Sequence, residues 1–343
     1  MKIILDAMGG DNAPEAVVLG ALDAVKEFDT EIILVGKGEE ILAAMKKNGI
    51  SDLPAGVAIA NADDVVAMHD EPAAVLHKRK NSSMVVGLKM LAEGQGDAFV
   101  SAGSTGALLT AATLVVKRVK GIRRAAMAPA FPNKAGGKTI ICDCGANAEC
   151  TPEFLLQFAI VGSLHAKKSL GLQNPRVGLL NIGTEDSKGT ALQLAVYPML
   201  QEAHQKGLIN FIGNVEARQV PMGEVDVVVC DGFSGNVLLK SIEGTAMFLG
   251  STISAMFKKS IVSKLAAAMV MKDIKAFKKL LDYREIGGTQ FLGIKKPVIK
   301  AHGSSDRRAF YSAVRQAMDA AKNNTAEELE IALKQIAAAK EKA

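Results

Sequence analysis

The 343-residue sequence contains no tryptophan, and aromatic residues make up only 4% of it. Proteins that bind nucleic acid commonly combine a basic surface with aromatic side chains, so nucleic-acid binding is a poor explanation of this chain. No apolar run approaches the ~20 residues that a membrane-spanning helix needs. The first apolar run, Ile3–Leu5, is too short for a signal peptide. We therefore expect an ordinary soluble globular protein of the cytoplasm.

Cysteine and histidine are also scarce, with four and five residues respectively. The cysteines at positions 142, 144, 150 and 230 form no C-x-x-C pair, and no histidine stands near them at the spacing of zinc ligands. They are typical of buried free thiols in a reducing compartment. The sequence thus indicates no metal site.

Three common catalytic motifs are missing. No G-x-G-x-x-G follows the first apolar run, and VGKG stands where the acidic residue of a dinucleotide site belongs. The loop GTEDSKG contains a lysine but does not have the order of a phosphate-binding Walker loop. A G-x-S-x-G nucleophile turn is absent too. These absences argue against a nucleotide cofactor and against a serine nucleophile.

Apolar runs typical of strands alternate with helical periodicity along the chain, which predicts a doubly wound, mostly parallel α/β sheet. There is no long linker or repeat, so we expect residues 1–343 to form a single large α/β unit. The clearest strands are predicted at 31–36, 97–103, 138–145, 176–183, 225–232 and 297–303. Helices are predicted at 14–27, 38–47, 82–93, 105–118, 152–166, 189–205, 235–249, 306–322 and 325–341.

The predicted strands end in a common pattern of glycine, small polar residues and a helix start. The stretches are DAMGGDN, SAGSTGA, DCGANAE, NIGTEDSKG, DGFSGN and AHGSSD. In the first of them, Asn12 and Glu15 have the spacing of a capping box around Pro14. Ligands of open parallel sheets bind outside the carboxyl ends of the strands. So many backbone N–H groups at these ends predict a site for phosphate or another oxyanion.

The same strand ends resemble those of the PlsX family, the bacterial acyl-[acyl-carrier-protein]:phosphate acyltransferases. The matching stretches, between residues 6 and 306, are DAMGGDNAP, SAGSTGA, DCGAN, NIGTEDSKG, IGNVEAR, DGFSGNVLLK and PVIKAHGSSD. The resemblance implies a fold like that of isopropylmalate dehydrogenase and phosphotransacetylase. It also implies a homodimer at the inner face of the membrane. The residues themselves imply no metal or organic cofactor.

The activity implied is transfer of a long-chain acyl group from acyl carrier protein to inorganic phosphate, the first step toward phosphatidic acid. A glycerol-3-phosphate acyltransferase would be the downstream partner. Three alternatives remain at this point. Two are enzymes of similar fold, a CoA-linked phosphate acyltransferase and an NAD-dependent hydroxy-acid dehydrogenase. The third is a membrane scaffold that binds acyl carrier protein without catalysis.

The implied reaction needs a cation and hydrogen-bond donors rather than a protein nucleophile, because phosphate is already an anion. Lys188, in a glycine-bounded loop, is the predicted cation. Asn236 is predicted to donate to the carbonyl oxygen, with exposed backbone N–H groups of Ser234 and Gly235 beside it. His302 is predicted to donate to phosphate or to protonate the leaving thiolate.

The other residues of the predicted site come from the same strand ends. Asn147 and Thr105 are expected to contact the ligand. Asp6, Asp143 and Asp231 are expected to orient loops, since free carboxylates would repel phosphate. The full set predicted to form the substrate-binding wall is Asp6, Gly9, Gly10, Gly103, Ser104, Thr105, Gly106, Asn147, Thr184, Ser234, Gly235 and Ser304.

Residues 250–285 interrupt the alternation of strands and helices, because their sequence predicts helix with no strand before it. Residues 258–279 hold seven lysines and one aspartate, a net charge of +6. Apolar residues recur every three or four positions, which predicts an amphipathic helical excursion that docks on an anionic membrane. An acidic carrier protein or a dimer interface would also fit. The predicted docking residues are Met256, Phe257, Ile261, Lys264, Leu265 and Met269.

Overall fold

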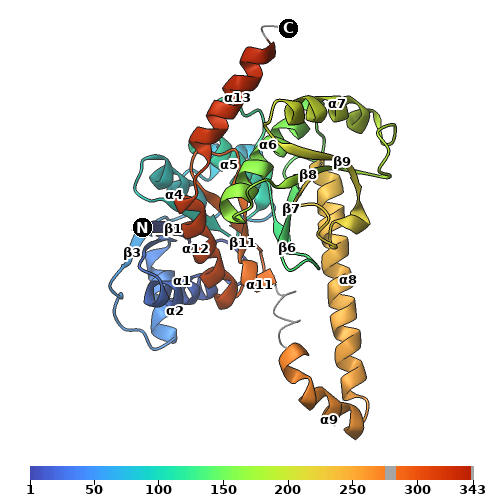
Figure 1. The fold of residues 1–343 in the computed structure, drawn as a ribbon. Coiled ribbons are helices and arrows are strands. Elements are labelled where there is room, and N and C mark those ends of the chain that lie inside the picture. Colours follow the sequence, from blue (N-terminus) through green and yellow to red (C-terminus); the bar gives the residue numbers. More distant parts are fainter. Residues whose placement is uncertain (275–282, 341–343) are drawn as a thin grey trace.

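The computed structural model describes residues 1–274 and 283–340, whose strands form two sheets (Figure 1). The first has the order β3-β2-β1-β4-β12-β11-β5, and the second the order β6-β7-β10-β8-β9. The strands of the first sheet are β1 (Lys2–Asp6), β2 (Glu31–Gly36), β3 (Val57–Asn61), β4 (Ala98–Ser101), β5 (Ala126–Met127), β11 (Gly288–Leu292) and β12 (Val298–Ala301). Those of the second are β6 (Ala130–Pro132), β7 (Lys138–Cys142), β8 (Arg176–Asn181), β9 (Asn210–Glu216) and β10 (Val227–Val229).

Helices cover both sheets. They are α1 (Glu15–Glu27), α2 (Gly38–Lys47), α3 (Val75–Lys78), α4 (Ser83–Ala92), α5 (Thr105–Val115), α6 (Pro152–Ser169), α7 (Ala191–Gln205), α8 (Gly232–Lys258), α9 (Ile261–Met269), α11 (Tyr283–Ile286), α12 (Arg307–Lys322) and α13 (Ala326–Lys340). Two short 3-10 turns, Pro72–Ala74 and Ala217–Gln219, complete the described elements.

The first sheet is buried on both faces, as its continuous apolar strands require. From β3 to β12 its strands run parallel, whereas β11 pairs antiparallel with both β12 and β5. Side chains alternate along β1, so Ile3 packs in the core under α1 and α12 while Ile4 packs in the core under α4 and α5. Because β1, β4 and β12 are parallel neighbours, their carboxyl ends lie side by side at one edge of the sheet.

The second sheet is also covered on both faces. Its strands are parallel except β6, and its core on one side is closed by α6 and α7. On the other side, Ile141 and Val228 pack with Leu238 of α8. The mostly parallel α/β class predicted from the sequence is therefore confirmed, with the strands divided over two sheets.

Two local predictions need correction. The capping box is wrong, because the side-chain amide of Asn12 instead donates to the carbonyl oxygen of Ser304 at 3.1 Å. Glu15 forms an ion pair with Lys47 at 2.7 Å, and the N-cap of α1 is Pro14 with no side-chain bond. The predicted strands also omitted β3, β5, β6, β9 and β11.

Helix α8 is the most protruding element, and it extends far from both sheets before α9 turns back beside it (Figure 1). It runs for 27 residues rather than ending at residue 249 as expected. Its buried residues, Gly232, Gly235 and Leu238, all lie in the first two turns. Residues 275–282 of the predicted excursion, including Lys275, Lys278 and Lys279, lie outside the described residues. Within the described ranges, no helix has the length and apolarity to cross a membrane.

Candidate functional site

The carboxyl end of β1 is organised around Asp6. Its side chain is 2% exposed, and its two oxygens accept hydrogen bonds from the hydroxyls of Ser83 and Ser101, both at 2.6 Å. Burial raises the pKa of this carboxyl, partly offset by these hydrogen bonds. Asp6 therefore holds the two serines and the loop after β1 in place, and its predicted contact with substrate stays a prediction.

The loops after β1, β4 and β12 are in direct backbone contact. The Asp11 N–H donates to the Gly303 carbonyl at 2.8 Å. A β-carbon on Gly9 would lie 2.9 Å from the amide nitrogen of Gly103, and Gly10 has φ +103°. Only glycine permits this approach and this backbone conformation. These predicted glycines thus form the frame that brings the three loops together.

Helix α5 begins at this edge. Ser104 is its N-cap residue and is nearly buried, whereas Thr105 is half-buried and Gly106 is exposed. The free N–H groups of a first helical turn favour an anion nearby. This position agrees with the predicted substrate wall but does not by itself identify a ligand.

The loop after β12 carries His302 and follows Lys300. The Nδ1 atom of His302 lies 2.8 Å from the Ser304 hydroxyl and 3.3 Å from the Ser304 amide nitrogen. The Lys300 ammonium donates to the carbonyl oxygens of Ala102 and Ala301. Burial lowers the pKa of Lys300 to about 8. The sequence prediction missed Lys300, although a lysine inside the otherwise apolar PVIKA strand was a signal.

At the second sheet, Asp143 follows β7 and has no exposed surface. It accepts backbone N–H bonds from Met127 at 2.8 Å, Cys144 at 2.6 Å and Asn147 at 2.6 Å. Burial raises the pKa of this carboxyl, and the hydrogen bonds oppose that rise. Asp143 therefore holds the loop after β7 in place, as the sequence predicted.

The side chain of Asn147 belongs to the same loop. Its amide nitrogen donates to the Ala125 carbonyl and to the Asp143 carboxylate, both at 2.9 Å. An asparagine amide has two N–H donors, so both are used inside the protein. The amide N–H groups of Asn147 thus support the loop, and its predicted contact with the ligand stays a prediction.

The first turn of α8 also differs from the prediction. The Asp231 side chain accepts the Ser234 N–H and the Ser234 hydroxyl, both at 2.8 Å. The Gly235 N–H donates to the Asp231 carbonyl at 3.0 Å. These backbone donors cap and continue the helix, so they are not exposed to substrate. Asn236 itself is exposed, and a β-carbon on Gly145 would lie 3.8 Å from its Cγ.

Lys188 lies in the loop after β8, which also carries the exposed Thr184. The Asn181 amide donates to the Lys188 carbonyl at 2.9 Å, and the Lys188 N–H donates to the Glu185 carbonyl at 3.2 Å. These bonds fix the loop, while the Lys188 side chain is exposed. Because β8 and β10 are parallel neighbours, Lys188 and Asn236 follow the same edge of one sheet.

The carboxyl edges of the two sheets meet at α8. His302, from the first sheet, interacts electrostatically with Lys240 and Glu243 of α8. Both residues lie one to two turns beyond Asn236 on the same helix. Charges on α8, which packs on the second sheet, therefore act on a histidine that follows a strand of the first sheet.

Comparison with known proteins identifies the family. Residues 1–328 match the family described as "Fatty acid synthesis protein". A phosphate acyltransferase of Bacillus licheniformis is 45% identical over 336 residues, covering 98% of this chain and 99% of the relative. One of Brevibacillus brevis is 48% identical over 315 residues and covers 92% of each chain. The chain belongs to this family, the PlsX family.

Solved structures share the fold at lower identity. A phosphotransacetylase of Streptococcus pyogenes superposes with a TM-score of 0.62 at 20% identity, covering 94% of both chains. A 4-hydroxythreonine-4-phosphate dehydrogenase of Burkholderia phymatum gives 0.51 at 14% identity, covering 93% of this chain and 97% of the other. This agrees with the fold that the PlsX resemblance implied.

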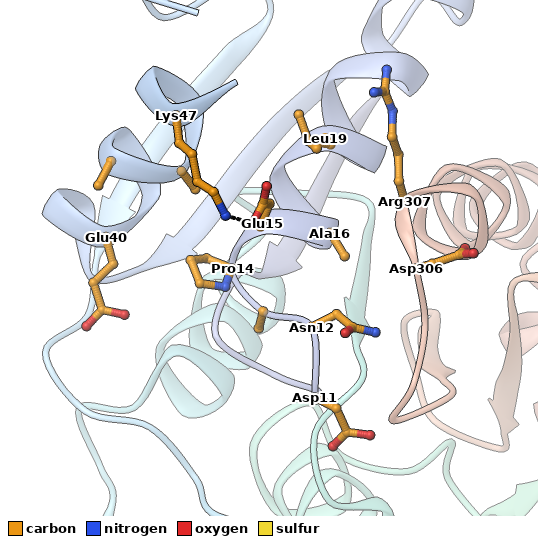
Figure 2. Close-up of a pocket in the computed structure, with 13 residues that line it drawn as sticks. Asp11, Asn12, Pro14, Glu15, Ala16, Leu19, Glu40, Lys47, Asp306 and Arg307 are labelled. Atoms are coloured by element: carbon orange, nitrogen blue, oxygen red, sulfur yellow. Dashed lines mark hydrogen bonds and ion pairs between the residues drawn. The ribbon is translucent and has the colours of Figure 1, made fainter. Parts of the chain in front are cut away.

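A separate cavity of about 760 Å³ lies beside α1 and α2 (Figure 2). Four carboxylates and two cations line it, and the Glu15–Lys47 ion pair crosses part of it. Phosphate would be repelled by this excess of negative charge. In this PlsX-family protein the cavity is therefore a poor phosphate site. Its charged lining residues are Asp11, Glu15, Glu40, Lys47, Asp306 and Arg307.

Proposed function

We propose that this protein transfers the acyl group of an acyl-[acyl-carrier-protein] thioester to inorganic phosphate. The products are an acyl phosphate and the free thiol of the carrier protein. The observation that carries this proposal is the placement of Lys188 and Asn236 after neighbouring parallel strands, at one edge of one sheet. Full-length similarity to proteins named phosphate acyltransferase supports it.

In the proposed reaction a phosphate oxygen attacks the thioester carbonyl carbon. A C–O bond forms and the C–S bond breaks, and its electron pair leaves with the sulfur. The proton of the attacking hydrogen phosphate ends on that sulfur, which gives the free thiol. The Lys188 ammonium neutralises the charge that gathers on the reacting groups, and the Asn236 amide donates to the carbonyl oxygen. No protein nucleophile is required, because phosphate itself supplies the attacking oxygen.

Incubation with acyl-carrier-protein thioester and phosphate tests this proposal. We expect thiol release that depends on phosphate, together with a product that hydroxylamine traps as the hydroxamate. Release from acyl-CoA but not from acyl carrier protein would instead favour the CoA-linked enzyme. A change in NAD absorbance would favour a dehydrogenase. Binding of carrier protein without product would favour a scaffold.

A further part of the proposal concerns the protruding helices α8 and α9. We propose that the protein is a cytoplasmic homodimer and that these helices bind it peripherally to the inner face of an anionic membrane. Four of the six predicted docking residues have exposures between 65% and 87%; these are Met256, Ile261, Leu265 and Met269. Phe257 and Lys264 instead line the groove between α8 and α9. An amphipathic acyl phosphate made beside a membrane could pass directly to a glycerol-3-phosphate acyltransferase.

Substituting glutamate for Leu265 should weaken membrane binding about tenfold or more, because an exposed apolar side chain contributes roughly 1.5–3 kcal/mol when buried. Sedimentation with anionic vesicles measures this. Ile331→Glu, at an equally apolar exposed position on α13, is the control and should bind like the wild type. Unchanged binding of the Leu265 variant would exclude the lipid role. A lost dimer in gel filtration would assign the surface to the second subunit.

A further inference from the structure

The loop that carries Lys188 is anchored from a neighbouring strand. It follows β8 and ends at Thr190, where the capping box of α7 begins. The side-chain amide of Asn214, on β9, donates to the carbonyl oxygen of Glu185 at 2.7 Å. The same oxygen accepts the Lys188 N–H at 3.2 Å. One carbonyl group therefore joins Asn214 to the residue that carries the predicted cation.

The backbone around Lys188 is held closely enough to direct its side chain. The Asn181 amide donates to the Lys188 carbonyl at 2.9 Å, and Gly189 adopts φ +107°. A β-carbon on Gly183 would lie 3.3 Å from Lys188 Cγ and 2.7 Å from a carboxylate oxygen of Glu185. The stem of the lysine therefore lies against the backbone of Gly183, on the side of the loop that the Glu185 side chain also occupies. A shift of the Glu185 backbone would thus move the lysine as well.

Strand β9 contains a β-bulge just before Asn214. Phe211 pairs with Val177 of β8. Three residues further along β9, Asn214 pairs with Leu179, which is only two residues further along β8. Gly213, inside the bulge, has φ +98°, a conformation that favours glycine. Bulges re-aim the side chains that follow them and are frequent beside functional sites.

The bulge decides which face of the sheet Asn214 occupies. Phe211 packs in the core under α6 and α7, whereas Val215 packs in the core on the opposite face. An uninterrupted strand would place both on one face, because they are four residues apart. Asn214 directly precedes Val215, so its side chain points to the face that α7 covers. The Lys188 loop leads into α7 and lies within reach there.

Asn214 is an uncommon residue for so buried a position. It is 5% exposed, and its buried side-chain oxygen has no hydrogen-bond partner among the residues that the structure describes. A buried acceptor without a partner destabilises a fold. An apolar side chain of similar size would avoid this cost, since the Lys188 N–H would still satisfy the Glu185 carbonyl. The position therefore favours a role in function over a role in stability.

We propose that Asn214 is the positioning residue of Lys188. It holds the Glu185 carbonyl, and through it the Lys188 backbone, in the place from which the ammonium acts on the reacting groups. This inference rests on the proposed function, in which Lys188 neutralises the charge of acyl transfer. Without Asn214 the loop would be free to shift, and a displacement of about 1 Å can cost a hundredfold in rate.

Substitution of Asn214 with leucine, which is similar in size but has no donor, tests the proposal. We expect kcat to fall about tenfold to a hundredfold, while the melting temperature stays within about 3 °C of the wild type. Asn210→Leu is the matched control, because Asn210 also lies on β9 but donates to the Asn174 carbonyl, before β8 rather than after it. This control should retain wild-type kcat. An unchanged kcat in Asn214→Leu would overturn the proposal.

Asn214→Asp supplies a pH readout of the same hydrogen bond. The two side chains have the same shape, but an ionised carboxylate cannot donate, whereas a protonated carboxyl can. Burial raises the pKa of a carboxyl, so the protonated fraction grows as the pH is lowered. The kcat of Asn214→Asp relative to the wild type should therefore rise with falling pH, and Asn214→Leu should show no such recovery. A ratio that stays low at every pH would overturn the donor role.

A double-mutant cycle separates positioning from a general loss of structure. Asn214→Leu should slow the Lys188→Ala enzyme by less than about twofold, because the ammonium that it positions is absent. Equal fold losses in both backgrounds would show a merely structural role and overturn the proposal. Absence of phosphate-dependent thiol release from the wild type would reject the proposed function itself. A slow Lys188→Ala enzyme beside a fully active Asn214→Leu enzyme would reject the positioning alone.

Discussion

Replacing Gly235 with alanine is expected to destabilise the protein by about 3 kcal/mol and to abolish acyl transfer. A β-carbon at this position would overlap the carbonyl oxygen of Asp143, which is backbone and cannot rotate away, and would lie 2.8 Å from the sulfur of the buried Cys230. The first turn of α8 would have to move, and Asn236 would move with it. Urea denaturation and the thiol-release assay measure the two effects.

Gly244→Ala is the matched control on the same helix. No atom lies within 4 Å of a β-carbon there, and the position is inside α8. Alanine favours helix over glycine by ~1 kcal/mol, so this variant should be slightly more stable and fully active. Equal stability of Gly235→Ala and the wild type would show that the α8 turn does not approach Asp143 so closely.

Lys188→Ala is expected to lower kcat/KM by about 10²–10³, the usual cost of removing one preorganised group that stabilises transition-state charge. Its side chain is exposed, so the free energy of unfolding should change by less than about 0.5 kcal/mol. Lys206→Ala, at the C-cap of α7, should leave the rate unchanged. A Lys188→Ala enzyme with wild-type kcat/KM would remove Lys188 from the mechanism.

Much of the fold was predictable because the helices have strong local signals. Helices α1, α2 and α12 begin and end within one residue of their predicted bounds. The division into two sheets was not predictable, since alternation of strand and helix does not say which strands pair. Strand β9 was missed because Gly213 interrupts its apolar pattern, and Gly213 adopts φ +98°. Strand β11 was missed because it follows residues 250–285, where the sequence interrupts the alternation of strand and helix.

The position of the candidate site, at the carboxyl ends of the strands, was also predictable, because the glycine and small polar residues follow these ends. The sequence could not predict which hydrogen-bond donors would be used inside the protein. Ser234 and Asn147 carry groups suited to ligand binding, but the structure uses those groups on Asp231 and Asp143. The positive charges of Lys240 and Lys300 lower the pKa of His302, and no local sequence pattern predicted that these residues act on it.

The anchoring of α8 has a mechanical consequence. A helix of 27 residues is about 40 Å long, and only its first two turns are buried. Asn236 lies near the buried end of this helix, and the exposed apolar residue Met256 lies near the other end. In the proposed function, a membrane bound at the tip would also restrain the turn that holds Asn236, so attachment and catalysis would be coupled through one helix.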